Sequence, residues 1–177
     1  FRLFEVRGDL QALDIAKMEE LRKESPLFFE GNPMVGEKLL SLARSKHIPC
    51  INVYLSPLAR DELRELQHPE RHVDLEEFVT EVMRRKLLRR TSAQKGLLSL
   101  PELEDIERRA QSAYGELKKA WQFDYVLPNH DGEDSENWTH FYYPLGDARK
   151  TLHIFTQILK GRDPGEGVEH WEKELLP

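Results

Sequence analysis

The chain has 177 residues and a formal net charge of −6. This excess of acidic side chains argues against binding to nucleic acid through a basic face. No apolar run is long enough to cross a membrane and no secretory signal is recognisable, so we expect no membrane insertion. The single cysteine, Cys50, lies in the apolar run 49–55, so we expect its side chain in the core. A single cysteine forms no internal disulfide, so we expect the protein in a reducing, cytoplasmic compartment.

The first half of the chain alternates between helical and strand-like patterns. Apolar residues at helical spacing predict helices over 14–24, 34–46 and 56–66. Short apolar runs predict strands over 26–30 and 49–55. Asp14 is expected to cap the first helix, and Ser56 and Pro57 to be the N-cap and first residue of the third.

The second half of the chain is mainly helical. Helices are predicted over 74–90, 100–121 and 145–161, and Gly161 is expected to end the last of them. The run FDYVL predicts a strand over 123–127, and residues 162–177 suit a linker with a short helix. Two helices carry predicted apolar stripes: Leu103, Ile106, Ala110, Ala113 and Leu117 in one, and Ala148, Leu152, Phe155 and Leu159 in the other.

Strands that alternate with helices predict an α/β fold, in which a parallel sheet has helices on both faces. The run 49–55 is almost free of polar residues, as expected of a strand that is buried on both faces of such a sheet. Three predicted strands make only a small sheet, so we expect further strands upstream of Phe1.

Polar side chains follow the predicted strand 123–127 closely: after Pro128 come Asn129, His130 and Asp131. Ligands of parallel sheets bind at the carboxyl ends of the strands. An asparagine there can both donate hydrogen bonds to the edge of a base and accept them from it. We therefore predict that this strand end faces a ligand.

Arginines are concentrated in the middle of the chain: Arg84, Arg85, Arg89 and Arg90 on one predicted helix, and Arg108 and Arg109 on the next. Basic residues at a helix C-terminus compensate the helix dipole, and charged runs commonly form a solvated face. The alternative is a mobile helical flap that presents arginines to phosphate groups, which the planar guanidinium binds in bidentate fashion.

No metal site is predicted. His68 and His72 have the spacing of two ligands on one helix face, but Pro69 lies between them and no third ligand is evident. The acidic segment 131–136 lacks the spacing of a calcium-binding EF-hand loop. The chain also contains neither the phosphate-binding motif G-x-x-x-x-G-K-[ST] nor a recognisable catalytic triad.

The segment 106–131 carries a pattern of spaced residues: Ile106, Arg109, Ala113, Glu116, Asp124, Asn129 and Asp131. In this pattern the segment resembles the C-terminal part of guanylate kinases, with His130 at a position where that family has aspartate. The segments 5–19 and 51–63 are similar to earlier parts of the same family.

The resemblance implies a P-loop kinase-like fold over residues 1–161, followed by the tail 162–177. In this fold, residues 66–100 are an inserted helical lid region that enlarges the family's lid. The family's P-loop would lie upstream of Phe1, outside this chain. ATP and Mg²⁺, the cofactors that the resemblance implies, would both need that P-loop.

The acceptor side of the chain departs from guanylate kinases. Arg2 stands where the family reads guanine with a glutamate, and Gln11 and Leu13 replace a phosphate-contacting tyrosine and a threonine or serine. Glu30 is the nearest acid to the family's paired aspartates. The resemblance therefore implies a small-molecule acceptor other than GMP, contacted by Arg2, Gln11 and Glu30, and a cationic Arg2 suits an anionic acceptor.

The ATP side matches the family better. Arg109 matches the lid arginine that approaches the transferred phosphate, which implies a catalytic role. Asn129 lies where the family contacts adenine, and His130 and Asp131 are expected to belong to the same ATP site. Further arginines are expected to contact phosphates from the lid: Arg89, Arg90 and Arg108.

Two functions are therefore open. One is an ATP-dependent kinase that phosphorylates a small molecule or nucleotide other than GMP. The other is a catalytically inactive guanylate kinase-like module with an interaction or structural role, suggested by the missing acceptor residues and the enlarged lid. The fold alone does not decide between them, because one scaffold can host both uses.

Overall fold

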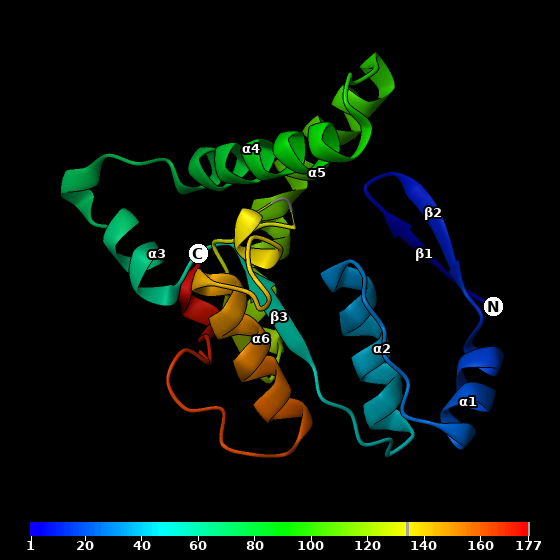
Figure 1. Ribbon diagram of the computed structural model, residues 1–177. Helices are drawn as coiled ribbons and strands as arrows, with labels where there is room; N and C mark the ends of the chain where they lie inside the picture. The colour runs from blue at the N-terminus through cyan, green and yellow to red at the C-terminus, as the bar shows by residue number, and fades with distance from the viewer. Residues whose placement is uncertain (134, 177) are drawn as a thin grey trace. The chain divides into compact units, whose positions relative to one another are not determined.

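The computed structural model describes residues 1–133 and 135–176. Over these residues the fold is mixed α/β, with six α-helices and two two-stranded sheets, one antiparallel and one parallel (Figure 1). The chain divides into unit 1, residues 1–50, and unit 2, residues 51–177. No helix in the described part of the chain is both long and apolar enough to cross a membrane.

The elements of unit 1 are β1 (Arg2–Val6), β2 (Asp9–Leu13), α1 (Ile15–Glu24) and α2 (Pro33–Ser45). Those of unit 2 are β3 (Val53–Ser56), α3 (Arg60–Leu66), α4 (Leu75–Lys95), α5 (Leu100–Leu117), β4 (Tyr125–Pro128) and α6 (Gly146–Leu159). Short 3-10 turns also lie in unit 2: η1 (Pro69–Arg71), η2 (Ala120–Gln122), η3 (Glu136–Trp138) and η4 (Lys173–Leu175).

Unit 1 is a β-hairpin followed by two helices. The turn between β1 and β2 is Arg7-Gly8, and both residues have positive φ angles (55° and 84°), as two-residue hairpin turns require. Asp14 caps α1 as predicted, because its carboxylate accepts a hydrogen bond of 3.0 Å from a backbone N–H of the first turn. Val6 of β1 and Val35 of α2 are buried, and β1 packs against α2.

Two predictions from the first apolar runs are wrong. Residues 26–30 form a loop between α1 and α2, where no described strand pairs with them and Phe28 is 70% exposed. Cys50 is exposed rather than in the core, because the strand predicted over 49–55 begins only at Val53. Apolar composition alone does not make a strand, since a strand needs a neighbour to complete its backbone hydrogen bonds.

Unit 2 is built around the parallel pair of β3 and β4. The register aligns Ser56 with Pro128, so both strands end at the same edge of the sheet. On the far side of β4, Val126 exchanges two backbone hydrogen bonds of 2.8 Å with Glu169 of the C-terminal segment. Among the described strands β3 pairs only with β4, so its other edge has no strand neighbour.

Helices cover both faces of this parallel pair. On one face, Leu127 packs against Ile154 and Ile158 of α6. On the other face, Tyr54 and Val126 belong to the main core of the unit. Further buried members of this core come from the surrounding helices and the C-terminal segment: Leu63, Val79, Ala113, Leu117, Trp171 and Leu176.

The start of α3 differs from its prediction. Ser56 is the last residue of β3, and its hydroxyl donates to the Leu58 carbonyl oxygen at 2.5 Å instead of capping a helix. The N-cap is Ala59, whose backbone N–H donates to the Glu62 carboxylate at 2.7 Å. A serine before a proline can end a strand as well as begin a helix, and here the pairing with β4 extends the strand through Ser56.

The long helices also differ from their predictions in detail. α4 continues past residue 90 and stops at Gly96, which has a φ of 78°. In α6, Leu152 and Leu159 are 45% and 56% exposed. Ala148 of the predicted stripe is buried, and the other buried residues of α6 are Thr151, Ile154 and Ile158. This helix has two apolar stripes, and the one that packs against β4 is buried.

Other features of these helices agree with their predictions. The predicted stripe of α5 is buried except at Leu103, which is 41% exposed. Gly161 follows the C-cap of α6 with a φ of 62°, as expected of a glycine that ends a helix.

Replacing Leu63 with alanine tests the main core of unit 2. Leu63 is fully buried, so the cavity should lower the free energy of unfolding by about 2–5 kcal/mol. Urea unfolding followed by tryptophan fluorescence measures this, because Trp121, Trp138 and Trp171 all lie in unit 2. The matched control is Leu97→Ala, since Leu97 is 98% exposed and its loss should change stability by no more than about 0.5 kcal/mol. Equal effects of the two substitutions would contradict the core described above.

Candidate functional site

The carboxyl end of β4 carries Asn129, which continues the pairing with β3. Its backbone N–H donates to the Ser56 carbonyl oxygen at 2.8 Å. Its side-chain oxygen accepts a hydrogen bond of 3.1 Å from the Asp131 N–H, which turns the chain away from the sheet. The side-chain amide nitrogen of Asn129 donates to no described residue. Asn129 therefore keeps a donor that a ligand can use.

The carboxylate of Asp131 ties the loop after β4 to the start of α6. It accepts hydrogen bonds from the Ser135 hydroxyl (2.9 Å), from the Asn137 amide (2.9 and 3.0 Å) and from the Ala148 N–H (2.8 Å). Burial alone would raise the pKa of Asp131, but these donors outweigh it and lower the pKa below its ordinary value. This aspartate is thus engaged within the protein rather than directed at a ligand.

His130 lies between two carboxylates. Its Nε2 is 2.8 Å from a Glu62 oxygen of α3, and its Nδ1 pairs with an Asp147 oxygen of α6. Burial acts to lower the pKa of His130, but hydrogen bonding and charge interactions with the two carboxylates outweigh it and raise the pKa. Below that pKa the ring is an imidazolium that donates to both acids.

Helices α4 and α5 form a helical hairpin, which we call the basic hairpin after the cluster of basic residues on α4. Its inner contact contains the buried residues Leu87, Ile106 and Ala110. Arg84 of α4 binds Glu107 of α5 in bidentate fashion, at 2.7 and 2.8 Å. This pair holds the pKa of Glu107 below its ordinary value, since the guanidinium donates directly to the carboxylate.

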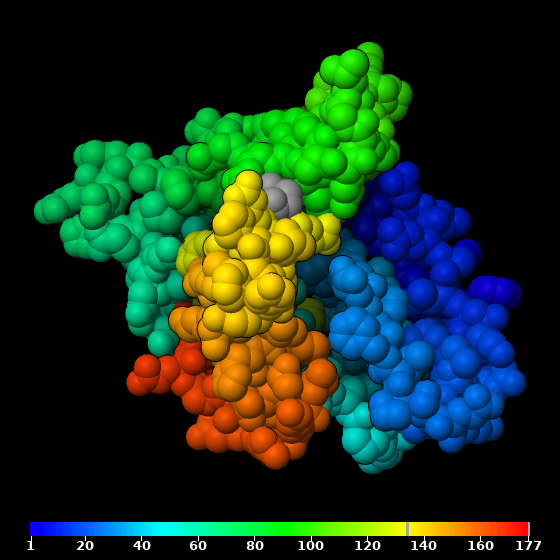
Figure 2. All heavy atoms as spheres, viewed as in Figure 1, coloured from blue at the N-terminus to red at the C-terminus, as the bar shows by residue number. Residues whose placement is uncertain are grey.

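Two cationic side chains of α4 reach the loop that follows β4. The Lys86 ammonium donates to the Asn129 carbonyl oxygen at 3.0 Å, and the Arg90 guanidinium lies 3.4 Å from a Glu133 oxygen. Figure 2 shows this loop (yellow) between the basic hairpin (green) and α6 (orange). Lys86 was not predicted, although it lies one helical turn before Arg90 and so shares its side of α4.

The other predicted arginines lie at different places on the basic hairpin. Arg89 is exposed on α4. On α5, Arg108 donates to Asp105 at 2.7 Å, and a guanidinium nitrogen of Arg109 lies 3.8 Å from the same carboxylate. The side chain of Arg109 is partly buried and Arg108 is exposed. Asp105 therefore neutralises part of the charge that was predicted to face phosphates.

The predicted acceptor residues all belong to unit 1. The hairpin register aligns Arg2 with Leu13 and Phe4 with Gln11, so Arg2 and Gln11 lie on the same face of the hairpin. Both are exposed. Glu30 is also exposed, in the loop between α1 and α2 rather than on the hairpin. The structure thus places Arg2 and Gln11 on one small surface.

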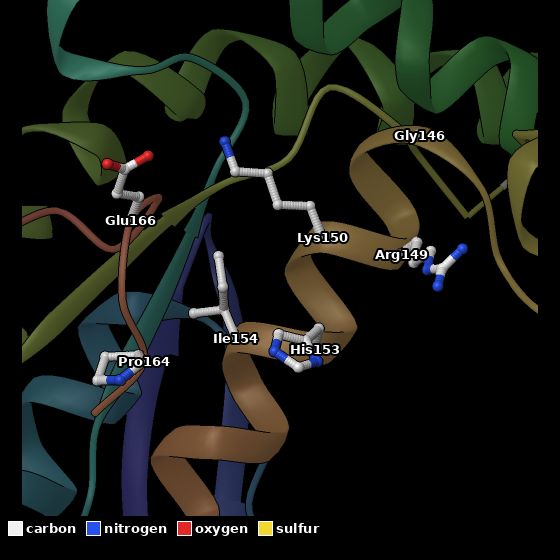
Figure 3. A pocket seen from close by; sticks show the side chains of 7 residues that line it. All are labelled: Gly146, Arg149, Lys150, His153, Ile154, Pro164 and Glu166. Carbon is white, nitrogen blue, oxygen red and sulfur yellow. The ribbon is translucent and has the colours of Figure 1, made fainter. Parts of the chain in front are cut away.

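Unit 2 also has a hollow of about 490 Å³ beside α6 (Figure 3). It is lined by residues of α6 and of the loop after it: Gly146, Arg149, Lys150, His153, Ile154, Pro164 and Glu166. None of the residues predicted to bind ATP lines it. Within the described residues, no group of three or more histidine, cysteine, aspartate or glutamate side chains is placed to hold a metal ion.

A comparison with known protein families, with curated proteins and with solved structures finds no match to this chain.

Replacing Asp131 with asparagine tests the network at the start of α6. The substitution keeps the shape but removes the charge, and should lower the free energy of unfolding at pH 7 by about 1–2 kcal/mol. The pKa of Asp131 is lowered in the folded state, so its stabilisation is complete above the ordinary value of 3.8 and is lost as the pH falls through the folded pKa. The difference between wild type and Asp131→Asn should therefore shrink in acid.

Urea unfolding at several pH values measures this difference. Glu104→Gln is the control, because Glu104 is exposed on α5 and its loss should have little effect at any pH. A difference that stays constant from pH 7 to acid would show that the charge of Asp131 does not stabilise the fold.

Proposed function

We propose that the chain is part of an ATP-dependent kinase of the guanylate kinase-like type, which phosphorylates a small molecule or nucleotide other than GMP. The observation that carries this proposal is the hydrogen bond of 3.0 Å from the Lys86 ammonium to the Asn129 carbonyl oxygen. Through this contact a helix rich in basic residues lies beside the carboxyl end of a parallel strand pair. That edge is where sheets of this kind bind ligands.

The chemistry of phosphoryl transfer suits such an arrangement. The transfer needs positioning and charge stabilisation more than covalent chemistry. In this proposal Lys86 and Arg90 turn from their present oxygen partners to phosphate oxygens, and Arg109 stabilises the transferred phosphoryl group. The contact of Arg90 with Glu133 is long and partly exposed, and pairs of this kind are worth no more than about 1 kcal/mol. Replacing the Glu133 carboxylate by a phosphate as the partner of Arg90 therefore costs little free energy.

ATP and Mg²⁺ would need a P-loop beside this strand end, because Lys86 and Arg90 do not replace a cradle of backbone N–H groups. In this proposal, residues of the complete protein upstream of Phe1 supply the P-loop. In the described part of the chain one edge of β3 has no strand neighbour, which supports this, since parallel sheets of two strands are unusually small. A further parallel strand beside β3 would bring its own carboxyl end to the same edge.

The acceptor would be an anionic molecule. Arg2 and Gln11 share one face of the β1–β2 hairpin and offer a guanidinium and an amide, which suit a carboxylate or phosphate. Guanine would instead need an acid at the position of Arg2, according to the resemblance to guanylate kinases. The proposed acceptor is therefore not GMP.

A second candidate is a catalytically inactive module that binds a protein. It is favoured by the internal hydrogen bonds of the strand end, where both ring nitrogens of His130 and the carboxylate of Asp131 are occupied by protein groups. In this case His130 and Asp131 would only stabilise the fold and would bind no nucleotide. This module would neither bind ATP with Mg²⁺ nor release ADP.

The decisive assay uses the complete protein with ATP, Mg²⁺ and a panel of nucleoside monophosphates and small anionic acceptors. We expect ADP to form only when a suitable acceptor is present. Arg109→Ala should then lower kcat by about 10³-fold, the range reported for an arginine that stabilises the transferred phosphoryl group. Arg64→Ala is the control, because Arg64 lies on the exposed side of α3 and should leave kcat unchanged.

Two results would overturn parts of this proposal. A complete protein that neither binds ATP nor forms ADP would establish the inactive module instead. Turnover of GMP at an ordinary kinase rate would show that Arg2 and Gln11 do not exclude guanine.

A further inference from the structure

One imidazole ring connects three elements of unit 2. His130 follows β4, and its two nitrogens contact Glu62 of α3 and Asp147 of α6. Glu62 is 68 residues away in the sequence, so this contact joins distant parts of the fold. The ring, Glu62 and Asp147 are each partly exposed, which leaves the ring accessible to protons from solvent.

The number of protons on this ring determines how many of its contacts are hydrogen bonds. An imidazolium has two N–H donors, whereas a neutral imidazole has one donor and one lone pair. Both partners of His130 are carboxylates, which only accept when ionised. When the ring loses its proton, one carboxylate must face a lone pair, and that contact becomes repulsive.

Both carboxylates also serve the start of a helix. Glu62 accepts a hydrogen bond of 2.7 Å from the Ala59 N–H at the N-cap of α3. Asp147 is the acidic residue in the first turn of α6, and its oxygen lies 3.4 Å from the backbone nitrogen of His130. A change at the ring therefore acts on the beginning of both helices. From α4, the Lys86 ammonium contacts the carbonyl oxygen of the adjacent Asn129.

We propose that His130 is a proton-dependent clasp: as the imidazolium it holds the carboxyl end of β4 between the starts of α3 and α6, and loss of the proton breaks its hydrogen bond to one of these two helix starts. His130 is thus a positioning residue, because it acts on Asn129 through the backbone rather than on a ligand. The clasp is a property of this chain by itself and does not depend on kinase activity.

The sign of the pH dependence follows from the direction of the pKa shift. Burial acts to lower the pKa of His130, but the two carboxylates outweigh it, so the folded pKa lies above the ordinary value of 6.5. The stabilisation is therefore complete below about pH 6.5 and is lost as the pH rises through the folded pKa. The clasp is closed in mildly acidic solution and opens as the pH rises through the folded pKa.

NMR titration of the 177-residue chain without any nucleotide tests the proposal. We expect the His130 ring to titrate above pH 6.5 and to show two N–H protons in the acidic form. The backbone amides of Ala59 and Asp147, which report on the two helix starts, should shift with the same midpoint. His153 is the matched control, because it is exposed on α6 and makes no ion pair with a described residue.

Variants separate the clasp from a general effect of pH. Glu62→Gln and Asp147→Asn should each lower the midpoint of His130 and leave that of His153 in place. His130→Gln should abolish the shared transition of the Ala59 and Asp147 amides. The proposal is overturned if wild-type His130 titrates at or below 6.5, or if those two amides do not follow its midpoint. The wild-type titration decides even if a variant fails to fold, and it is independent of whether the complete protein phosphorylates anything.

Discussion

The parallel pairing of β3 with β4 determines where the polar groups of the candidate site lie. Asn129 extends this pairing by one hydrogen bond, from its N–H to the Ser56 carbonyl oxygen at 2.8 Å. The next two residues then connect the strand end to the helices around it, His130 to α3 and α6 and Asp131 to α6. A shift of one residue in the register would turn each of these side chains to the opposite face. The geometry of the site is therefore a consequence of the strand pairing.

The basic hairpin is held unevenly along its length. Near its start, α4 contributes the fully buried Val79 to the main core of unit 2. Further along, the contact with α5 contains the buried residues Leu87, Ile106 and Ala110, with Leu88 and Leu98 packed against them. Lys86 and Arg90 connect this part to the loop after β4 by polar contacts. The partly exposed ion pair of Arg90 with Glu133 is worth no more than about 1 kcal/mol. Under the proposed kinase function, the far end of the hairpin would be the part that closes as a lid over a ligand.

Local signals in the sequence predict most helices, because a cap or an apolar period needs only neighbouring residues. Asp14 and Gly161 show this, since each lies at the helix end that its residue type favours. The failures share another cause. Residues 26–30 have the composition of a strand but no partner, and Ser56 precedes a proline yet belongs to a strand because β4 pairs with it. Such outcomes depend on distant residues, which one local pattern does not reveal.

The candidate site was predicted in the same uneven way. The end of β4 was predicted to within one residue, at 127 rather than Pro128, because an apolar run that turns polar is a local pattern. The partners of His130 were not, since Glu62 and Asp147 lie 68 and 17 residues away and carry no distinguishing motif. Lys86 was overlooked among the arginines, although its spacing of one turn from Arg90 was an available signal. The kinase proposal joins the resemblance in spacing to the contact of Lys86 with the strand end.

The central claim is that the carboxyl end of β4 is the nucleotide-binding end of unit 2. Photolabelling of the complete protein with 8-azido-ATP and Mg²⁺, followed by peptide mapping, tests it most directly. The label should fall in the part of the tryptic peptide 120–149 that precedes Gly146 and contains Asn129, and an excess of ATP should prevent it. Labelling in the hollow beside α6, on the peptide that follows Lys150, or no ATP-sensitive labelling at all, would contradict the claim.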